Sequence, residues 1–354
     1  MMESTTTVSA AGPRDLGRAW RELLAVEPKL RIRDAAARLG VSEASLRATG
    51  CGAGVTRLVE DWKAILRRVP LLGEVMALTR NESAVHEKVG EYAAPSFDGS
   101  GGLVLGGAID LRLFLDRWAH GFAVEEEGRM SLHFFDAHGD AVHKIYAREG
   151  SELGEFRKLV EIFEAEDQRP EVMVIPRPPR RAALADAAID VEGFRAAWLG
   201  LQDTHDFFAL LRRFGVSRTQ AMRLAPPGHA RRVVAESLEQ VLQQAAATEL
   251  PIMIFVGNPG CIQIHTGPVA RIVPMGPWIN VLDPGFNLHL RRDRIAEAWV
   301  VYKPTRDGIV SSLELFDAEG ETIALVFGAR KPGKPELPAW RELVEGLASA
   351  ATPG

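Results

Sequence analysis

The sequence predicts an α+β protein built by tandem duplication, with two large antiparallel β-sheets packed as a pseudo-symmetric pair and flanked by α-helices. Three observations lead to this fold class. Segments of the first half recur in the second half, a segment rich in Pro and Arg separates the halves, and each half has helix-like segments before short strand-like runs. Repeats of this kind indicate duplicated structural units, and helices segregated from antiparallel strands are typical of α+β folds.

The internal repeat consists of four matched segments in the same order. The pairs are LGVSEASLR from Leu39 with FGVSRTQAMR from Phe214, DLRLFLDRW from Asp110 with NLHLRRDRI from Asn287, FFDAHGDAVHKIY from Phe134 with LFDAEGETIALVF from Leu315, and FRKLVEIF from Phe156 with WRELVEGL from Trp340. The separation between partners grows slowly along the chain, which is what small loop insertions between two copies produce.

The segment between the copies predicts the division of the chain. Its sequence, EDQRPEVMVIPRPPRRAALADA, has the Pro and Arg content of an extended linker. We expect an N-terminal repeat at 1–170, a linker at 171–188 and a C-terminal repeat at 189–354.

Each half is expected to begin with helices and to continue with strands before a closing helix. In the second half, GFRAAWLGL and DFFALLRRFG have helical spacing of apolar residues, with Asp203 or Thr204 as N-cap and Gly215 as the stop. A short helix, SRTQAMRLA, follows with Ser217 as its cap. Alternating runs bounded by turn residues then predict antiparallel strands, among them PIMIFVG, CIQIHTG, WINVLD, EAWVVYKP, SSLELFD and TIALVFG.

Composition narrows the class of protein. The chain has 354 residues, 46% hydrophobic and 25% charged, with a formal net charge of −5, which argues mildly against a general nucleic-acid binder. Its two cysteines form no C-x-x-C motif, the start has no signal-peptide pattern, and no apolar run is long enough to span a bilayer. We therefore expect a soluble cytoplasmic protein without membrane insertion.

Two sequence features suggest chemistry that we weigh against structural roles. RDAAARLGVSEASLRATG, from Arg33, has the pattern of a DNA-binding helix-turn-helix, although the same pattern in the second half favours a duplicated scaffold. Cys261 and His265 are four positions apart on a predicted strand and share a face, yet structural roles are the better interpretation. The glycine-rich GSGGLVLGG fails the spacing of a phosphate-binding loop and is expected to be a turn and strand.

Among nine histidines, His205 is the candidate metal ligand. It aligns with Leu30 of the first half, so the shared fold does not require histidine there. A neutral imidazole beside Phe207 and Phe208 suits haem iron, because apolar groups then cover the porphyrin. Asp203 or Asp206 is expected to accept the other ring N–H and so fix the tautomer.

At these residues the chain resembles the proteobacterial HemS/HmuS/PhuS family of hemin-binding, hemin-degrading proteins. The resemblance covers almost the whole chain. It is carried by MALTRNESAVHEKVGEY from Met76, GGAIDLRLF from Gly106, DTHDFFALLRRFGVSR from Asp203, NPGCIQIHTGP from Asn258 and FGARKPGKPE from Phe327.

The resemblance implies haem b as cargo or substrate, with His205 as the axial iron ligand. It places Arg218, Lys303 and Arg330 near the propionates, where cations suit partly buried carboxylates. It places Arg112 and Phe114 on the distal side and Phe255 in the pocket. Two positions depart from the family: Phe327 stands where some members have tyrosine, and Leu325 where some have glutamine. Alternatives stay open: the three cations as surface charges, Arg112 paired with Asp110 or Asp116, and the phenylalanines as plain core.

The function implied by the resemblance is receipt of imported haem and its delivery for iron release. The expected partners are haem, an inner-membrane haem ABC transporter and a haem oxygenase. The alternative is an enzyme that opens the macrocycle with external reductant, in which Arg112 polarises a distal water or oxygen species. DNA binding through the segment from Arg33 is the third hypothesis, and the net charge disfavours it.

Overall fold

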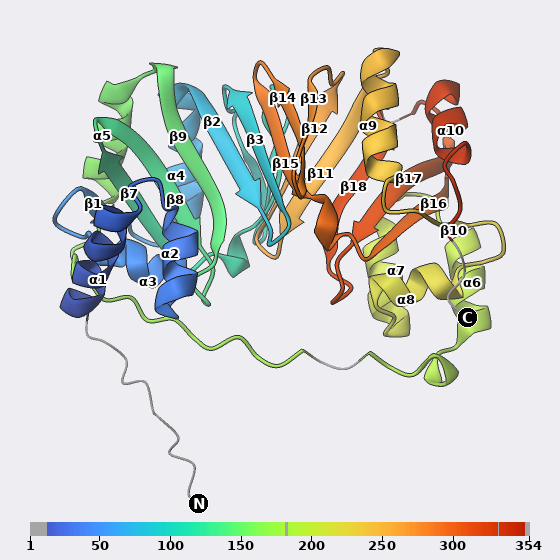
Figure 1. Cartoon of the computed structure of the whole chain (residues 1–354), viewed down its shortest axis with the longest axis horizontal. Coiled ribbons are helices and arrows are strands. Elements are labelled where there is room, and N and C mark those ends of the chain that lie inside the picture. The colour runs from blue at the N-terminus through green and yellow to red at the C-terminus, as the bar shows by residue number, and fades with distance from the viewer. Residues whose placement is uncertain (1–12, 181–182, 332, 351–354) are drawn as a thin grey trace, which may run out of the picture.

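The computed structural model describes residues 13–180, 183–331 and 333–350 (Figure 1). Residues 181–182, inside the predicted linker, and the start and end of the chain lie outside this description. In the first half the helices are α1 (Pro13–Val26), α2 (Ile32–Leu39), α3 (Glu43–Ala48), α4 (Trp62–Arg68) and α5 (Leu153–Phe163). Its strands are β1 (Val55–Arg57), β2 (Gly73–Arg80), β3 (Ala84–Gly90), β4 (Ser96–Asp98), β5 (Gly101–Val104), β6 (Asp110–Phe114), β7 (His120–Glu126), β8 (Arg129–Phe135) and β9 (Ala141–Ser151).

The second half repeats this order with small changes. Its helices are α6 (Val191–Leu199), α7 (Asp206–Phe214), α8 (Arg218–Leu224), α9 (Ser237–Ala247) and α10 (Pro338–Glu345). Its strands are β10 (Ala230–Val233), β11 (Ile252–Asn258), β12 (Cys261–Gly267), β13 (Ile272–Met275), β14 (Trp278–Asp283), β15 (Phe286–Arg291), β16 (Glu297–Thr305), β17 (Gly308–Phe316) and β18 (Thr322–Gly328). The predicted α+β class and the tandem duplication are confirmed.

Local sequence signals account for most helix ends near the site. Gly215 ends α7 in the left-handed region at φ 64°, which glycine adopts without steric cost. Ser217 and Gln220 form a capping box at the start of α8. The prediction that Asp203 or Thr204 caps α7 is wrong, because the N-cap is His205 and Asp203 binds the backbone N–H of His205 instead.

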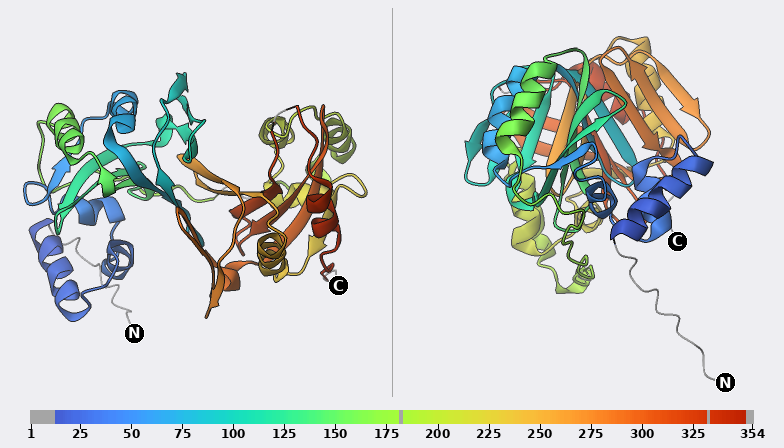
Figure 2. Two further views of the ribbon diagram at one scale, coloured as in Figure 1. Left: turned by 90° about the horizontal axis from the view of Figure 1, so that it is seen from above. Right: turned by 90° about the vertical axis from the view of Figure 1, so that its left-hand side faces the viewer.

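The two nine-stranded antiparallel sheets exchange strands between the halves. The first sheet has the order β1-β7-β8-β9-β2-β3-β15-β14-β13, and the second has β10-β16-β17-β18-β11-β12-β6-β5-β4. Strands β4–β6 of the first half thus extend the sheet of the second half, while β13–β15 do the reverse. Figure 2 shows the two exchanged segments on opposite sides of the molecule. The chain divides by sequence into two repeats, but neither sheet belongs to one repeat alone.

The segment between the repeats follows matching turns of the two halves. The backbone N–H of Ile175 binds the carbonyl of Ala137, and Arg177 pairs with Asp140 in the β8–β9 turn. Arg180 lies 2.8 Å from Glu321 in the matching turn of the second half. Figure 1 shows the segment passing below both sheets, between the helices at either end.

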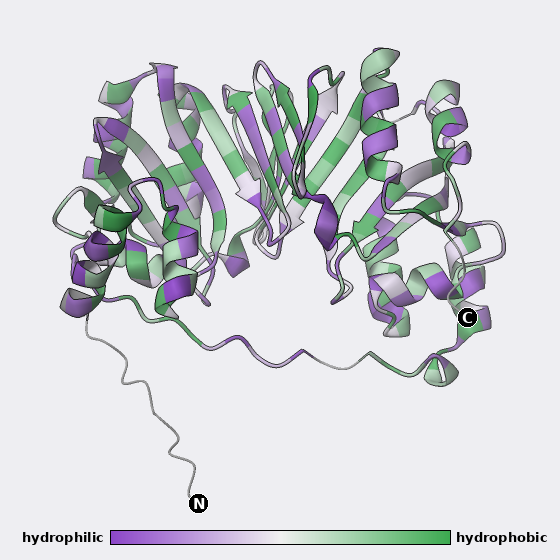
Figure 3. Ribbon diagram, in the orientation of Figure 1, coloured by the Kyte–Doolittle hydropathy of each residue, from purple (hydrophilic) through white to green (hydrophobic). Residues whose placement is uncertain are grey.

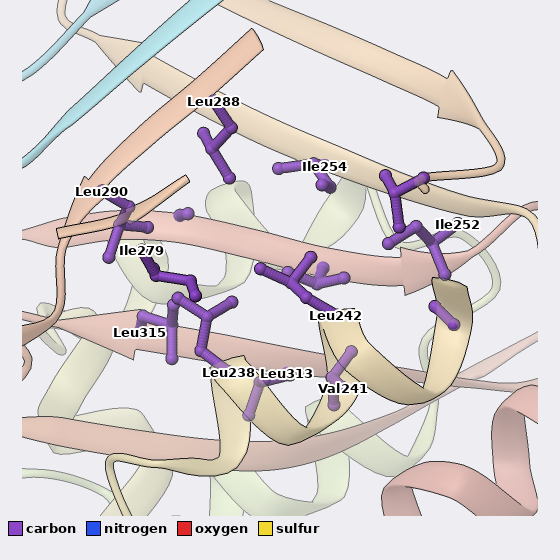
Figure 4. Packing of buried hydrophobic residues seen from close by; sticks show 14 of the residues in the cluster. Leu238, Val241, Leu242, Ile252, Ile254, Ile279, Leu288, Leu290, Leu313 and Leu315 are labelled. Carbon is purple, nitrogen blue, oxygen red and sulfur yellow. The ribbon is translucent and has the colours of Figure 1, made fainter. Parts of the chain in front are cut away.

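The hydrophobic core of the second half is built from strands of both sheets. Leu238, Val241 and Leu242 of α9 face Ile254 and Leu313 of the second sheet (Figure 4). The same cluster includes four residues of the exchanged strands, Ile279, Val281, Leu288 and Leu290, all fully buried. Helix α9 was not anticipated from the sequence, although its apolar spacing is helical; Figure 3 shows it banded between apolar and polar residues.

We expect Leu242→Ala to lower the free energy of unfolding by about 2–5 kcal/mol, because a fully buried leucine leaves a cavity when truncated. Chemical denaturation of both proteins measures the change. Leu199→Ala is the matched control, since that side chain is 51% exposed and its loss should cost little. Equal losses for the two variants would contradict the assignment of Leu242 to the core.

Candidate functional site

One face of the second sheet gathers most of the side chains singled out from the sequence. Directly paired residues of antiparallel strands point to the same face. Ser312 pairs with Phe327, Glu314 with Leu325, and Leu325 with Phe255. Further along, Ile262 pairs with Arg112. Lys303 of β16 belongs to the same face through its pairing with Val310, two residues before Ser312. We call this surface the ligand face.

The helices α6, α7 and α8 cover one end of the ligand face. Phe194, Trp198 and Phe207 of these helices share a buried cluster with Val301 and Phe316 of the sheet. Strand β6, with Arg112 and Phe114, lies at the other end of the face. In Figure 2 the helices and the β4–β6 segment rise on the same side of the sheet, so they flank the strands between them.

His205 is an exposed imidazole whose orientation is set by one neighbour. Its side chain is 80% exposed, and its Nδ1 lies 2.6 Å from Oδ1 of Asp203. The same carboxylate oxygen accepts the backbone N–H of His205 at 2.9 Å, and this bond is the largest cause that keeps the pKa of Asp203 below its usual range. With Nδ1 donating to a carboxylate, Nε2 carries the lone pair available to a metal.

We expect Asp203→Ala to weaken binding of hemin about 10- to 100-fold, because the imidazole would lose the partner that fixes its tautomer and direction. Absorbance titration with hemin measures the affinity. Asp206→Ala is the control, since that neighbouring carboxylate makes no side-chain hydrogen bond to His205 among the described residues. Identical affinities for the two variants would contradict the role of Asp203.

Arg218 and Lys303 converge on a carboxylate that the sequence analysis did not single out, Glu314. Arg218 donates from Nε and Nη2 to Glu314 at 2.8 and 3.2 Å, and Nζ of Lys303 lies 2.5 Å from Oε1. Burial alone would raise the pKa of Glu314, but the two cations outweigh it and hold the pKa well below its usual range. Burial lowers the pKa of Lys303 to about 8.

The ring of Phe207 joins this ion network to the histidine. Nζ of Lys303 lies 4.4 Å, and the guanidinium carbon of Arg218 5.5 Å, from the ring centroid. Phe207 is two residues beyond His205 and packs edge-on against Trp198 at 4.7 Å. Cation–π contacts of this kind stabilise the start of α7 against the sheet. The network therefore positions the helix that carries the candidate ligand.

The central strands and the β6 end of the ligand face are less polar than the end with the ion network. Phe255 and Phe327 are half-buried neighbours with ring centroids 5.1 Å apart. Arg112 pairs with Asp110, one of the two partners considered from the sequence, and its side chain is 28% exposed. Phe114 is 39% exposed, so it is not plain core. Apolar rings and a cation at the β6 end thus lie on one surface.

Arg330 lies beside the loop of the candidate ligand. It follows β18 and places Nη1 3.5 Å from Asp307 in the β16–β17 turn, with its side chain 16% exposed. The backbone N–H of Arg306 in that turn donates to the carbonyl of Gln202. The positive charge of Arg330 also contributes to the lowered pKa of Asp203. The structure therefore brings His205, Arg218, Lys303 and Arg330 to one end of the face and Arg112 to the other.

The helix-turn-helix segment is packed in a way that does not suit a DNA reader. In α3, which would be the recognition helix, Glu43, Ala44, Leu46, Arg47 and Ala48 are buried. Arg47 pairs with Glu126, and Glu43 binds Lys144 and Arg80. Because these residues of α3 are buried against the rest of the protein, few of its side chains could contact bases in a major groove.

We expect the double variant Arg33→Ala, Arg47→Ala to show the same behaviour as the parent in a gel-shift assay, with no salt-sensitive complex in either case. The physical reason is the burial of Arg47 and the pairing of Arg33 with Glu82. A salt-sensitive shift of the parent that the double variant abolishes would restore the DNA-binding hypothesis.

Cys261 and His265 have separate structural surroundings. The thiol of Cys261 is buried 3.4 Å from the Thr79 hydroxyl, while His265 stacks on Phe286 with ring centroids 3.8 Å apart. Among the residues that the structure describes, no group of three potential metal-ligating side chains of the His, Cys, Asp or Glu types comes together. The structural interpretation of both residues fits these contacts.

The fold and the ligand face define a class of protein. A duplicated scaffold presents one exposed imidazole at the start of a helix, an apolar floor and a set of cations, which suits a flat, metal-centred ligand with acidic groups. The family model for the haemin-degrading HemS.ChuX domain matches the chain twice, at residues 40–163 and 215–347. The chain belongs to this family, and the resemblance inferred from the sequence is confirmed.

Individual relatives agree with this assignment. The chain is 41% identical over 331 residues to the hemin transport protein HmuS of Yersinia pestis, covering 91% of this chain and 94% of HmuS. It superimposes on holo-PhuS, a heme-binding protein from Pseudomonas aeruginosa, with a TM-score of 0.94 and 47% identity, covering 96% and 100% of the two chains. The heme degrading enzyme ChuS of Escherichia coli O157:H7 gives 0.88 and 36%, covering 95% and 100%.

Proposed function

We propose that the protein binds haem b through His205, carries it in the cytoplasm and delivers it for iron release. The observation that carries this proposal is the imidazole of His205, exposed at the start of α7 with Nδ1 already bonded to Asp203. An imidazole oriented in this way offers Nε2 to an iron ion. The names of two close relatives, a hemin transport protein and a heme-binding protein, support the same ligand.

The residues of the ligand face supply what the cargo needs. Haem is an apolar disc with two carboxylates, so it requires apolar contact over the ring and cations at one edge. Phe255 and Phe327 offer the first, and Arg218 and Arg330 offer the second. Because the His205 side is open to solvent, haem can leave by exchange of a single protein ligand. A reversible carrier needs that property.

The partners of such a carrier are an inner-membrane haem ABC transporter that supplies the cargo and a haem oxygenase that receives it. In the described ranges, the structure contains no helix of the length and apolarity required to cross a membrane.

The second candidate function is degradation of haem with external reductant. ChuS, a heme degrading enzyme, supports it, and Arg112 at the far end of the face would act on the distal side. The family resemblance implies glutamine and tyrosine in some members at the positions where this chain has the apolar side chains of Leu325 and Phe327. The loss of those hydrogen-bonding groups favours binding over turnover.

One incubation separates carrier from enzyme. The hemin complex is mixed with NADPH and a reductase, with and without oxygen, in the presence of catalase, because free peroxide destroys haem without enzymatic catalysis. A carrier keeps its Soret band and passes intact haem to an added haem oxygenase. Loss of the band in the aerobic sample alone, with release of a defined tetrapyrrole, would show the enzyme instead.

A further inference from the structure

We propose that Lys88 is a site of covalent acylation, at which its side-chain amine takes up an activated acyl group such as that of an acyl phosphate. Lys88 belongs to MALTRNESAVHEKVGEY, a segment to which the ligand face gives no role. The site lies outside the ligand face, so this inference does not depend on the proposed function.

The amine of Lys88 lies where the two repeats meet. Strand β3 of the first sheet and strand β12 of the second sheet contact each other through polar side chains. Nε2 of Gln263 lies 2.9 Å from Nδ1 of His86, and Nζ of Lys88 lies 3.2 Å from Nδ1 of His265. Ile262 of β12 belongs to the ligand face, and side chains alternate along a strand, so Gln263 and His265 lie on the opposite face.

The immediate neighbours of the amine are uncharged. Nε2 of His265 lies 3.3 Å from the carbonyl oxygen of Pro268, so Nε2 carries the hydrogen and Nδ1 accepts from Lys88. Burial lowers the pKa of His265 to about 4, which keeps the ring neutral at neutral pH. Nζ of Lys88 also lies 5.5 Å from the ring centroid of Phe286, and this ring stacks on His265 at 3.8 Å. A neutral imidazole and an aromatic ring therefore hold the amine in place.

Other lysines of the chain have different surroundings. Lys144 and Lys303 each bind a buried glutamate, and Lys158 is 63% exposed and lies 2.6 Å from Glu155. A carboxylate favours the ammonium form, which has no lone pair and cannot attack an acyl carbon. Lys88 is partly exposed, and no carboxylate lies within ion-pair distance of its Nζ in the part of the chain that the structure describes. It is therefore accessible to a small reagent without being held as the ammonium by a contacting anion.

Two opposing effects act on the pKa of Lys88. Partial burial is the larger effect and lowers this pKa, while the negative charge of Asp283 at the end of β14 opposes it. The carboxylate of Asp283 accepts the backbone N–H groups of Ala270 and Arg271 at 2.9 and 2.7 Å. His86, the other titratable group beside this contact, is neutral because burial holds its pKa well below the usual range. At neutral pH, the free amine is consequently a larger fraction of Lys88 than of a fully solvated lysine.

The reaction requires only the amine and the acyl donor. The lone pair of Nζ attacks the acyl carbon of the acyl phosphate and forms a C–N bond. The C–O bond to phosphate breaks, the phosphate leaves with the electron pair, and the nitrogen loses a proton to water. An amide replaces the ammonium, so the contact between the repeats loses one positive charge.

The test measures the rate of acylation at individual lysines of the full chain. The protein is incubated with acetyl phosphate near neutral pH, and peptide mass spectrometry follows the acetyl group at each site. We expect Lys88 to react at least about threefold faster than Lys29 and Lys158, which are both exposed. In urea the three lysines should react at equal rates, because the preference depends on the folded surroundings. Equal rates at the three lysines of the folded protein would overturn the proposal.

A charge variant tests the cause of the preference. Asp283→Asn removes the negative charge that favours the ammonium form of Lys88. It should raise the rate at Lys88 at least about twofold and leave the rate at Lys158 unchanged. An unchanged or slower rate at Lys88 in the folded variant would contradict the proposal. If this variant fails to fold, the comparison of the three lysines in the parent still decides the matter.

Discussion

His205→Ala is expected to weaken hemin binding by at least about 100-fold and to change the absorption spectrum of any complex that forms. Loss of a group that merely orients a metal ligand costs about 10- to 100-fold, so loss of the ligand should cost no less. His205 is the candidate with an exposed ring and an oriented tautomer. Titration followed at the Soret band measures both the affinity and the coordination.

Two controls sharpen this experiment. His229→Ala removes a partly exposed histidine of the second half, whose Nδ1 lies 3.1 Å from the carbonyl of Pro227, and it should bind like the parent. His205→Gly with added imidazole should recover the parental spectrum, because the free ring can occupy the vacated position. If the variant lacking His205 titrates like the parent, another residue ligates the iron and the proposed site is wrong.

The C-terminal repeat alone, residues 189–354, is expected to form a dimer by exchange of strands. Without the first half, β12 loses its neighbour β6 and β15 loses β3. Unpaired edges of this kind bind other strands readily. The repeat makes β15 the counterpart of β6, so a second copy can pair β15 with β12 in the register that β6 used. Size-exclusion chromatography with light scattering measures the mass.

This dimer would change the distal side of the ligand face. The alignment of DLRLF with NLHLR puts His289 where Arg112 stands, and Arg291 where Phe114 stands. We therefore expect the fragment to bind hemin through His205 with a spectrum different from that of the full chain. Adding the N-terminal repeat together with the linker, residues 1–188, during refolding should restore the parental spectrum. A monomeric fragment with the parental spectrum would contradict the importance of the exchanged strands.

Much of the architecture was predictable because it depends on local patterns. The repeat appears as matched segments, and the strands appear as alternating runs between turn residues. Helix α9 was missed although its apolar spacing carried the signal. The sequence also carried a signal for Glu314. In SSLELF, Ser312 and Glu314 are two positions apart, so on a strand both side chains lie on the face shared with Phe327. An acidic residue on a buried strand face indicates a nearby cation, but it does not say which one.

By itself, the sequence determined the α+β duplication, the separation of the halves by a Pro- and Arg-rich segment, and the choice of His205 as the residue that the shared fold does not need. Only the tertiary structure decided that β6 brings Arg112 into the other repeat's sheet, and that Lys303 is enclosed with Glu314 while Arg218 reaches the surface. The reason is physical. Period and turn chemistry are properties of neighbouring residues, whereas strand exchange and the pairing of buried charges depend on residues far apart in the chain that meet only after folding.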